Sequence, residues 1–105
     1  MDYRLPQQLS NVGSGRVALT WTYPPAIKDN VVGARILYTD QNGEHVERWQ
    51  RVDIHNAQQR AAVLMGLRAN TNYHVQIVPL LYDGEPAFQW AEKLRIRAEA
   101  PSAEA

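Results

Sequence analysis

Histidine and serine are the residues of this 105-residue chain that could take part in catalysis, and their spacing argues against it. His45, His55 and His74 are scattered, and no two of them stand at the spacing of paired metal ligands. Ser14 lies in Gly-Ser-Gly, which lacks the Gly-x-Ser-x-Gly spacing and the strand-to-helix context of a nucleophile elbow. The chain also contains no cysteine and no glycine-rich phosphate loop. We therefore expect no enzymatic activity, no metal ion and no cofactor.

A row of cations is the first candidate binding site. Lys93, Arg95 and Arg97 alternate with apolar residues, so in a strand they share one face, about 7 Å apart. Such a face could hold a polyanion, and the alternative is a solvated strand whose charges prevent aggregation at a sheet edge. The formal net charge of the chain is zero, which argues against bulk electrostatic binding to nucleic acid or to an anionic membrane.

Apolar residues that face outward are the second candidate. In the segment 61–65, AAVLM, Val63 and Met65 point outward if the residues beside them point into the core. A contiguous exposed apolar patch often marks a protein interface. The alternative is strand propensity alone, because isolated exposed apolar residues are ordinary. We expect Leu37 and Val78 to point outward from the other sheet in the same way.

Three aromatic residues close to a turn are the third candidate. Tyr82, Phe88 and Trp90 surround a turn whose tip is Asp83-Gly84. Tyrosine and tryptophan are favoured contact residues in protein interfaces, so this loop could bind a protein partner. The alternative is that one or two of these rings cap the end of the core or pack on a neighbouring domain.

The elements that must position these groups are strands. Apolar residues recur at every second position over most of the chain, with turn signals about every 8–12 residues, as in an all-β sandwich or barrel. Asn42-Gly43 and Asp83-Gly84 supply tight turns. We count seven strands and find no segment with a helical period of 3.6 residues. The predicted core residues are Trp21, Ile36, Tyr38, Leu64, Leu67, Tyr73, Val75 and Ile77.

The segment 66–77, GLRANTNYHVQI, indicates how the chain passes from one sheet to the other. The crossing lies between Leu67 and Tyr73, and a crossing leaves backbone polar groups near the core that need partners. A tyrosine at the start of the next strand can bury its ring and direct its hydroxyl to the backbone upstream, in a tyrosine corner. We therefore expect Leu67 to fill the core, Thr71 to lie in the turn and Tyr73 to hold the crossing in place.

Three patterns in this order and spacing resemble the fibronectin type III domain. They are Trp21 on the second strand, Ala34-x-Ile36-x-Tyr38 on the third, and Leu67-x-Ala69-x-Thr71-x-Tyr73 at the corner. Ala69 stands where the family usually has proline, and Ala34 stands where it often has an aromatic residue. The resemblance extends from about Leu5 to Ala98.

The resemblance implies a seven-stranded antiparallel β-sandwich of the immunoglobulin-like class that has no enzymatic activity. It implies a module that serves as a spacer or as a protein-binding surface. In such a fold the last strand lies in one sheet with the sixth and third strands, which adds His74 and Arg35 to the cationic face. Some fibronectin type III modules bind heparin through such faces, so heparan sulfate is the alternative to a protein partner.

We assign residues 1–98 to one domain and 99–105, a small and polar segment with a proline, to a linker. No apolar run approaches the about 20 residues that span a bilayer, so we expect no membrane insertion. The N-terminus lacks a signal-peptide pattern, which leaves a cytosolic protein or a segment of a larger chain.

The whole pattern resembles modules of cell-surface adhesion and guidance receptors. This resemblance implies an extracellular location and contacts with neighbouring domains of the same chain. The alternatives are an intracellular scaffold module and an accessory domain of a polysaccharide-degrading enzyme.

Overall fold

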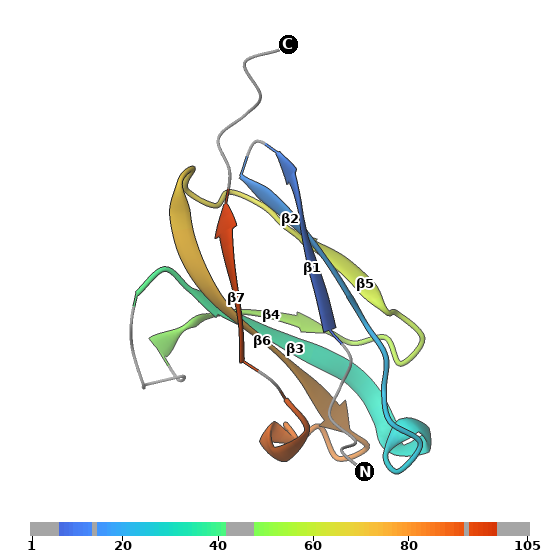
Figure 1. Ribbon diagram of the computed structural model, residues 1–105. Helices are drawn as coiled ribbons and strands as arrows, with labels where there is room; N and C mark the ends of the chain where they lie inside the picture. The colour runs from blue at the N-terminus through green and yellow to red at the C-terminus, as the bar shows by residue number, and fades with distance from the viewer. Residues whose placement is uncertain (1–6, 14, 42–47, 92, 99–105) are drawn as a thin grey trace.

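Two stacked antiparallel sheets form the protein in a computed structural model that describes residues 7–13, 15–41, 48–91 and 93–98 (Figure 1). For residues 7–13 and 93 it describes the backbone alone. The described residues form seven strands: β1 (Gln7–Gly13), β2 (Arg16–Trp21), β3 (Val31–Thr39), β4 (Gln50–Ile54), β5 (Ala61–Leu64), β6 (Thr71–Leu81) and β7 (Lys93–Ala98). Two of the connections contain short 3-10 helices, η1 (Lys28–Asn30) and η3 (Phe88–Trp90).

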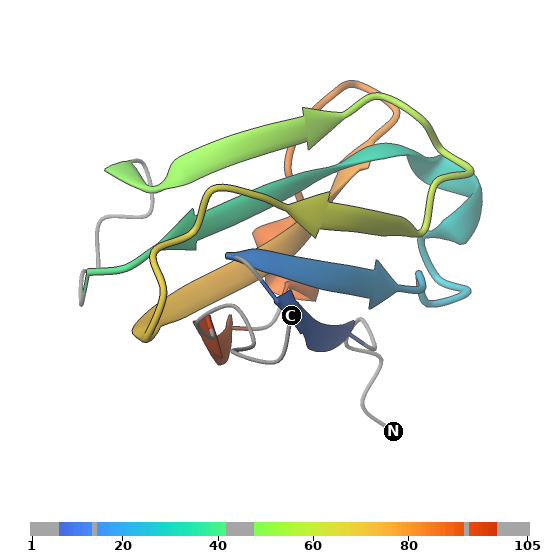
Figure 2. The same cartoon turned by 90° about the horizontal axis from the view of Figure 1, so that it is seen from above.

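One sheet has the strand order β1-β2-β5 and the other has the order β4-β3-β6-β7. Strands β1 and β7 contact each other, so they lie on the same side of the sandwich. The open edges of β4 and β5 therefore lie together on the opposite side (Figure 2). These observations confirm the predicted seven-stranded sandwich and the predicted neighbours of the last strand. The predicted turn at Asn42-Gly43 lies outside the described residues.

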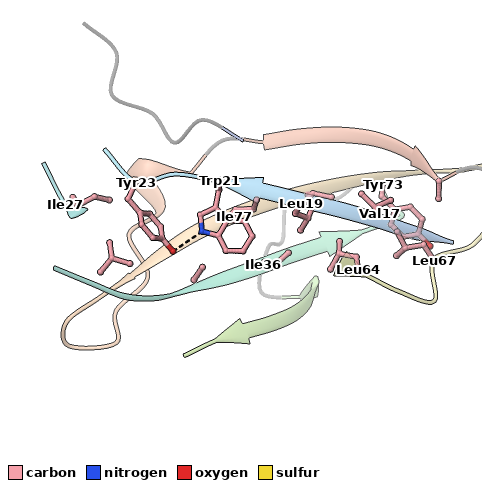
Figure 3. Close-up of a cluster of buried hydrophobic side chains, with 14 residues drawn as sticks. Val17, Leu19, Trp21, Tyr23, Ile27, Ile36, Leu64, Leu67, Tyr73 and Ile77 are labelled. Atoms are coloured by element: carbon pink, nitrogen blue, oxygen red, sulfur yellow. Dashed lines mark hydrogen bonds between the residues drawn. The ribbon is translucent and has the colours of Figure 1, made fainter. Parts of the chain in front are cut away.

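The core lies between the sheets and follows the period-two pattern of the sequence. On β2 the side chains of Val17, Leu19 and Trp21 are buried, whereas those of Arg16 and Thr20 are exposed. The buried side chains of β3, β5 and β6 meet this row from the other strands (Figure 3). Seven of the predicted core residues are buried: Trp21, Ile36, Leu64, Leu67, Tyr73, Val75 and Ile77. The eighth, Tyr38, is only partly buried and packs against the cluster.

The prediction that Leu37 and Val78 form an exposed apolar face was wrong, because both side chains are buried. Both residues lie on the two central strands of their sheet, where neighbours flank them on each side. Val78 is opposite Arg35 in the register, and Leu37 lies between Arg51 and Gln76. Long side chains can cover apolar neighbours with their aliphatic stems while keeping their polar ends in water.

A buried polar network joins β2 to β3 and was not anticipated from the sequence. The indole nitrogen of Trp21 donates to the hydroxyl of Tyr23 at 3.0 Å (Figure 3). That hydroxyl donates to the carbonyl of Gly33 at 3.3 Å. Burial raises the pKa of Tyr23, so the hydroxyl keeps the proton that it donates. The guanidinium of Arg60 lies 4.3 Å from the centre of the Tyr23 ring, within the range of a cation–π contact.

The tyrosine corner is present. The hydroxyl of the buried Tyr73 accepts a hydrogen bond from the backbone N–H of Arg68 at 2.9 Å, five residues upstream. Leu67 is buried beside it, and its N–H donates to the carbonyl of Gly15 in the turn between β1 and β2. Thr71, which we expected in the turn, is the first residue of β6, and its hydroxyl donates to the carbonyl of Ala69.

Replacing the corner hydroxyl tests this account. We expect Tyr73→Phe to lower the free energy of unfolding by about 1–3 kcal/mol, because the Arg68 N–H loses its partner while the ring remains in place. Tyr82→Phe removes the same hydroxyl from a side chain that is largely exposed, and we expect a change within about 0.5 kcal/mol. Urea unfolding of both variants measures the difference. Equal stability of Tyr73→Phe and the unmodified domain would contradict a structural role for the corner.

Candidate interaction surfaces

Metal-binding side chains do not cluster in the part of the chain that the structure describes. No group of three or more histidine, aspartate or glutamate side chains within this part of the chain could hold a metal ion. His45 and Ser14, whose spacing in the sequence argues against catalysis, lie outside it. No helix formed by the described residues has the length and hydrophobicity needed to cross a membrane.

A shallow groove crosses the outer face of β6 and β7. It is lined by Asn72, His74, Arg95, Ile96 and Arg97. In the register of the two strands, His74 is directly opposite Arg95 and Asn72 is directly opposite Arg97. Because side chains alternate across a strand, these two pairs project from the same face. The structure thus brings together three of the five residues that we predicted to bind a polyanion, His74, Arg95 and Arg97.

The electrostatics of the groove are cationic. Both arginines are exposed, and Arg95 has no carboxylate partner among the residues that the structure describes. The imidazole of His74 is half-buried and packs against the ring of Trp49, with the two ring centres 6.2 Å apart. Two guanidinium groups together with the side chains of His74 and Asn72 can donate hydrogen bonds to sulfate or carboxylate oxygens.

The other two predicted members of the cationic face do not contribute a described side chain to the groove. Arg35 pairs with Asp53 on the neighbouring strand β4, with its Nε 2.9 Å from the carboxylate. The register places it opposite Val78, four residues along β6 from His74. For Lys93 the structure describes only the backbone, which pairs with Gln76.

Asn72 is a groove residue that the sequence analysis missed. Its signal was present in the sequence, because it stands two residues before His74 and therefore faces the same side of the strand. It immediately precedes the corner tyrosine, Tyr73, on β6.

The loop between β6 and β7 presents two aromatic side chains on an anchored backbone. Tyr82 is 77% exposed and Phe88 is 47% exposed. The N–H of Leu81 donates to the carbonyl of Glu85, and the N–H of Ala87 donates to the carbonyl of Pro79. The turn at Asp83-Gly84 is present as predicted, with Gly84 at a positive φ of 82°. Hydrogen bonds across the base of the loop thus hold the aromatic residues in a defined place.

Trp90, the third aromatic residue of this group, has a different position. It is half-buried and packs against the hydrophobic core at the end of η3. It therefore caps the core, as one of the sequence-based alternatives stated, and exposes little surface to a partner.

The apolar face on β5 is exposed. Val63 is 51% exposed on the outer side of the strand, and Met65, immediately after the strand, is 66% exposed. Ala61 and Thr20 on the same side are exposed as well, and Ala18 is half-buried. The register places Ala18 directly opposite Val63.

Solved structures with the same fold are similar to this chain at low sequence identity. A chicken CNTN1 structure with domains FN1–FN3 matches with a TM-score of 0.71 and 20% identity, over 89% of this chain and 30% of that chain. This chain thus spans less than one third of the length of the CNTN1 structure. The fn3 domain of the human collagen alpha-1(XX) chain matches with a TM-score of 0.71 and 18% identity, over 94% of this chain and 86% of that one. These likenesses establish the fold.

The family assignment comes from the sequence itself. No curated protein sequence matches the chain. The family described as the fibronectin type III domain matches residues 6–93, which include the second-strand tryptophan, the crossing and the corner tyrosine. The chain therefore belongs to the fibronectin type III family.

Proposed function

We propose that this domain is a non-catalytic interaction and spacer module of a larger adhesion or receptor protein at the cell surface. Fibronectin type III domains commonly act as protein-interaction or spacer modules, generally without catalytic activity, and are often extracellular. Figure 1 supports the spacer role, because β1 and β7 run in the same direction. The first described strand thus begins toward one end of the sandwich and the last one ends toward the other. This arrangement suits domains joined in series.

The observation that carries the interaction role is the exposed pair Tyr82 and Phe88. Burying such rings in a partner releases a large apolar area from contact with water, and tyrosine also retains a polar group for a hydrogen bond. The hydrogen bonds at Pro79, Leu81 and Glu85 hold the loop before binding, which lowers the entropy lost on association. A protein partner on the extracellular side fits this pair best.

Cell binding by the multimerised domain tests this proposal. We expect saturable binding to at least some cell lines, and loss of that binding after the cells are treated with protease. A Tyr82→Ser/Phe88→Ser variant should bind at least about tenfold more weakly, because two central aromatic contacts are lost. Its melting temperature should fall by only a few degrees, because Tyr82 is largely exposed and only about half of the Phe88 side chain is covered.

A Val63→Thr/Met65→Ser variant is the matched control, since it removes two exposed apolar side chains elsewhere. Undiminished binding by the Tyr82/Phe88 variant would exclude the loop as the contact surface. A complete absence of binding to every cell line would count against the interaction role.

A second function is favoured by the groove on β6 and β7. We propose that Asn72, His74, Arg95 and Arg97 bind a sulfated polysaccharide such as heparan sulfate, with Lys93 as a further contact. The support for this proposal is that the cross-strand pairs His74–Arg95 and Asn72–Arg97 line one groove. Successive cations on one face of β7 lie about 7 Å apart, so an extended polyanion could contact both arginines at once.

The salt dependence of heparin binding tests the second function. We expect the domain to bind a heparin oligosaccharide at low salt. In Arg95→Ala/Arg97→Ala the slope of log K against log salt concentration should fall by about two, one unit for each lost cationic contact. Lys28→Ala/Arg51→Ala removes the same charge from other exposed positions and should leave the slope unchanged. An equal loss in both variants would show that total charge, and not the groove, governs binding.

A further inference from the structure

Strand β5 is a short edge strand that contains no charged residue and no proline, and its pairing with β2 has no bulge. Charged side chains, prolines and bulges keep the edges of natural sheets from pairing with other chains. The other three edge strands each have such a feature: Arg51 and Asp53 on β4, Arg95 and Arg97 on β7, and a register shift between Asn11 and Gly13 on β1. β5 consists of two alanines, a valine and a leucine in continuous register with β2.

The charged residue that directly precedes β5 is engaged by other contacts. Arg60 precedes the strand, and its guanidinium lies over the ring of Tyr23. The same group donates hydrogen bonds to the carbonyls of Ala57 and Gln59. These contacts engage the guanidinium of Arg60 in the segment before β5 begins.

The pattern of hydrogen bonds identifies the backbone groups at the open edge. The N–H of Trp21 donates to the carbonyl of Arg60, so these residues form a hydrogen-bonded pair between β2 and β5. Hydrogen-bonded and non-hydrogen-bonded pairs alternate along an antiparallel ladder. The N–H and C=O groups of Ala61 and Val63 therefore point away from β2, toward the open edge. The side-chain amide of Gln59 already donates to the carbonyl of Ala61 at 2.8 Å.

We propose that this edge pairs with the β5 edge of a second copy of the chain, antiparallel and centred on Val63. In this register Val63 lies opposite Val63 of the other copy, and Ala61 lies opposite Met65. These pairs are apolar and self-complementary, so a two-fold axis makes the same contacts twice. The formal net charge of zero means that two copies do not repel each other as whole molecules.

The exposure of Val52 is a second observation that favours a partner chain beside the β5 edge. Val52 is opposite the fully buried Ile36 in the register and thus faces the space between the sheets, yet 39% of it is exposed. It lies on β4, whose edge is on the same side of the sandwich as β5 (Figure 2). A strand added beyond β5 extends the three-stranded sheet toward β4 and covers this side chain.

Sedimentation equilibrium tests the proposal directly. The edge is short, so we expect a weak dimer, and the concentration series should reach about 1 mM. The weight-average mass of the unmodified domain should rise from the 11.9 kDa of one chain toward twice that value. Val63→Pro removes an N–H that the β2–β5 ladder does not use, so the variant should fold. Its dimer dissociation constant should rise by about tenfold or more.

Two further variants make the test specific. Val63→Thr retains the N–H and the β-branched side chain, and its dissociation constant should stay within about threefold of the unmodified value. Gln59→Ala frees the Ala61 carbonyl of a competing donor, so its dimer should be about threefold tighter. A mass that stays at 11.9 kDa throughout, or a Val63→Pro variant that dimerises like the unmodified chain, would overturn the proposal.

If Val63→Pro does not fold, hydrogen exchange at the backbone amides of the unmodified domain tests the proposed pairing. The N–H of Val63 points to the open edge and should exchange more slowly as the protein concentration rises. An exchange rate independent of concentration would overturn the pairing.

Discussion

The hydrogen bond between the Arg68 N–H and the Tyr73 hydroxyl is the interaction on which the rest of the sandwich depends. At this point the chain leaves one sheet and enters the other, and a part-buried donor without a partner would be costly. Backbone hydrogen bonds join the same crossing to the first turn and to the last strand of the domain. Leu67 bonds to Gly15 in the first turn, and Asn70 bonds to Ala98 at the end of β7. Gly15 has a positive φ of 71°, and a Cβ there would lie 2.3 Å from the Leu67 carbonyl oxygen, so only glycine allows this approach.

Interactions between residues that are close in the sequence were predictable, and for this reason the sandwich fold was predicted correctly. The alternation of buried and exposed residues on β2 and the spacing of Leu67 and Tyr73 along the sequence each involve only a few neighbouring residues. The burial of Val78 was not predictable in this way, because it depends on Arg35 lying opposite it on another strand. The ion pair between Arg35 and Asp53 likewise depends on the β3–β4 register, and no pattern within either strand specifies that register.

The same limit applies to the candidate surfaces, because patterns within one strand do not specify which residues lie opposite each other on neighbouring strands. Alternation along β7 predicted that Arg95 and Arg97 share a face, and the structure places both in one groove. Asn72 shares a face with His74 by the same alternation, but its position opposite Arg97 depends on the register between β6 and β7. The position of Trp90 depends on the 3-10 helix η3, a conformation of three residues that is too short to leave a periodic signal. Its burial follows from that local turn, whereas Tyr82 remains outside it.

The candidate surfaces of this domain differ in their charge. On β7 the arginines that make the groove cationic also place charge on an edge strand, where charge opposes pairing with other chains, so the polyanion binding that we propose would use the same residues. On β5 the absence of charge leaves backbone groups available for pairing. The sheet order places these edges on opposite sides of the sandwich, and the loop with Tyr82 is distinct from both. A dimer through β5 would therefore leave the groove open. Because salt screens exposed charges but hardly weakens contacts between apolar groups, the two associations should respond differently to ionic strength.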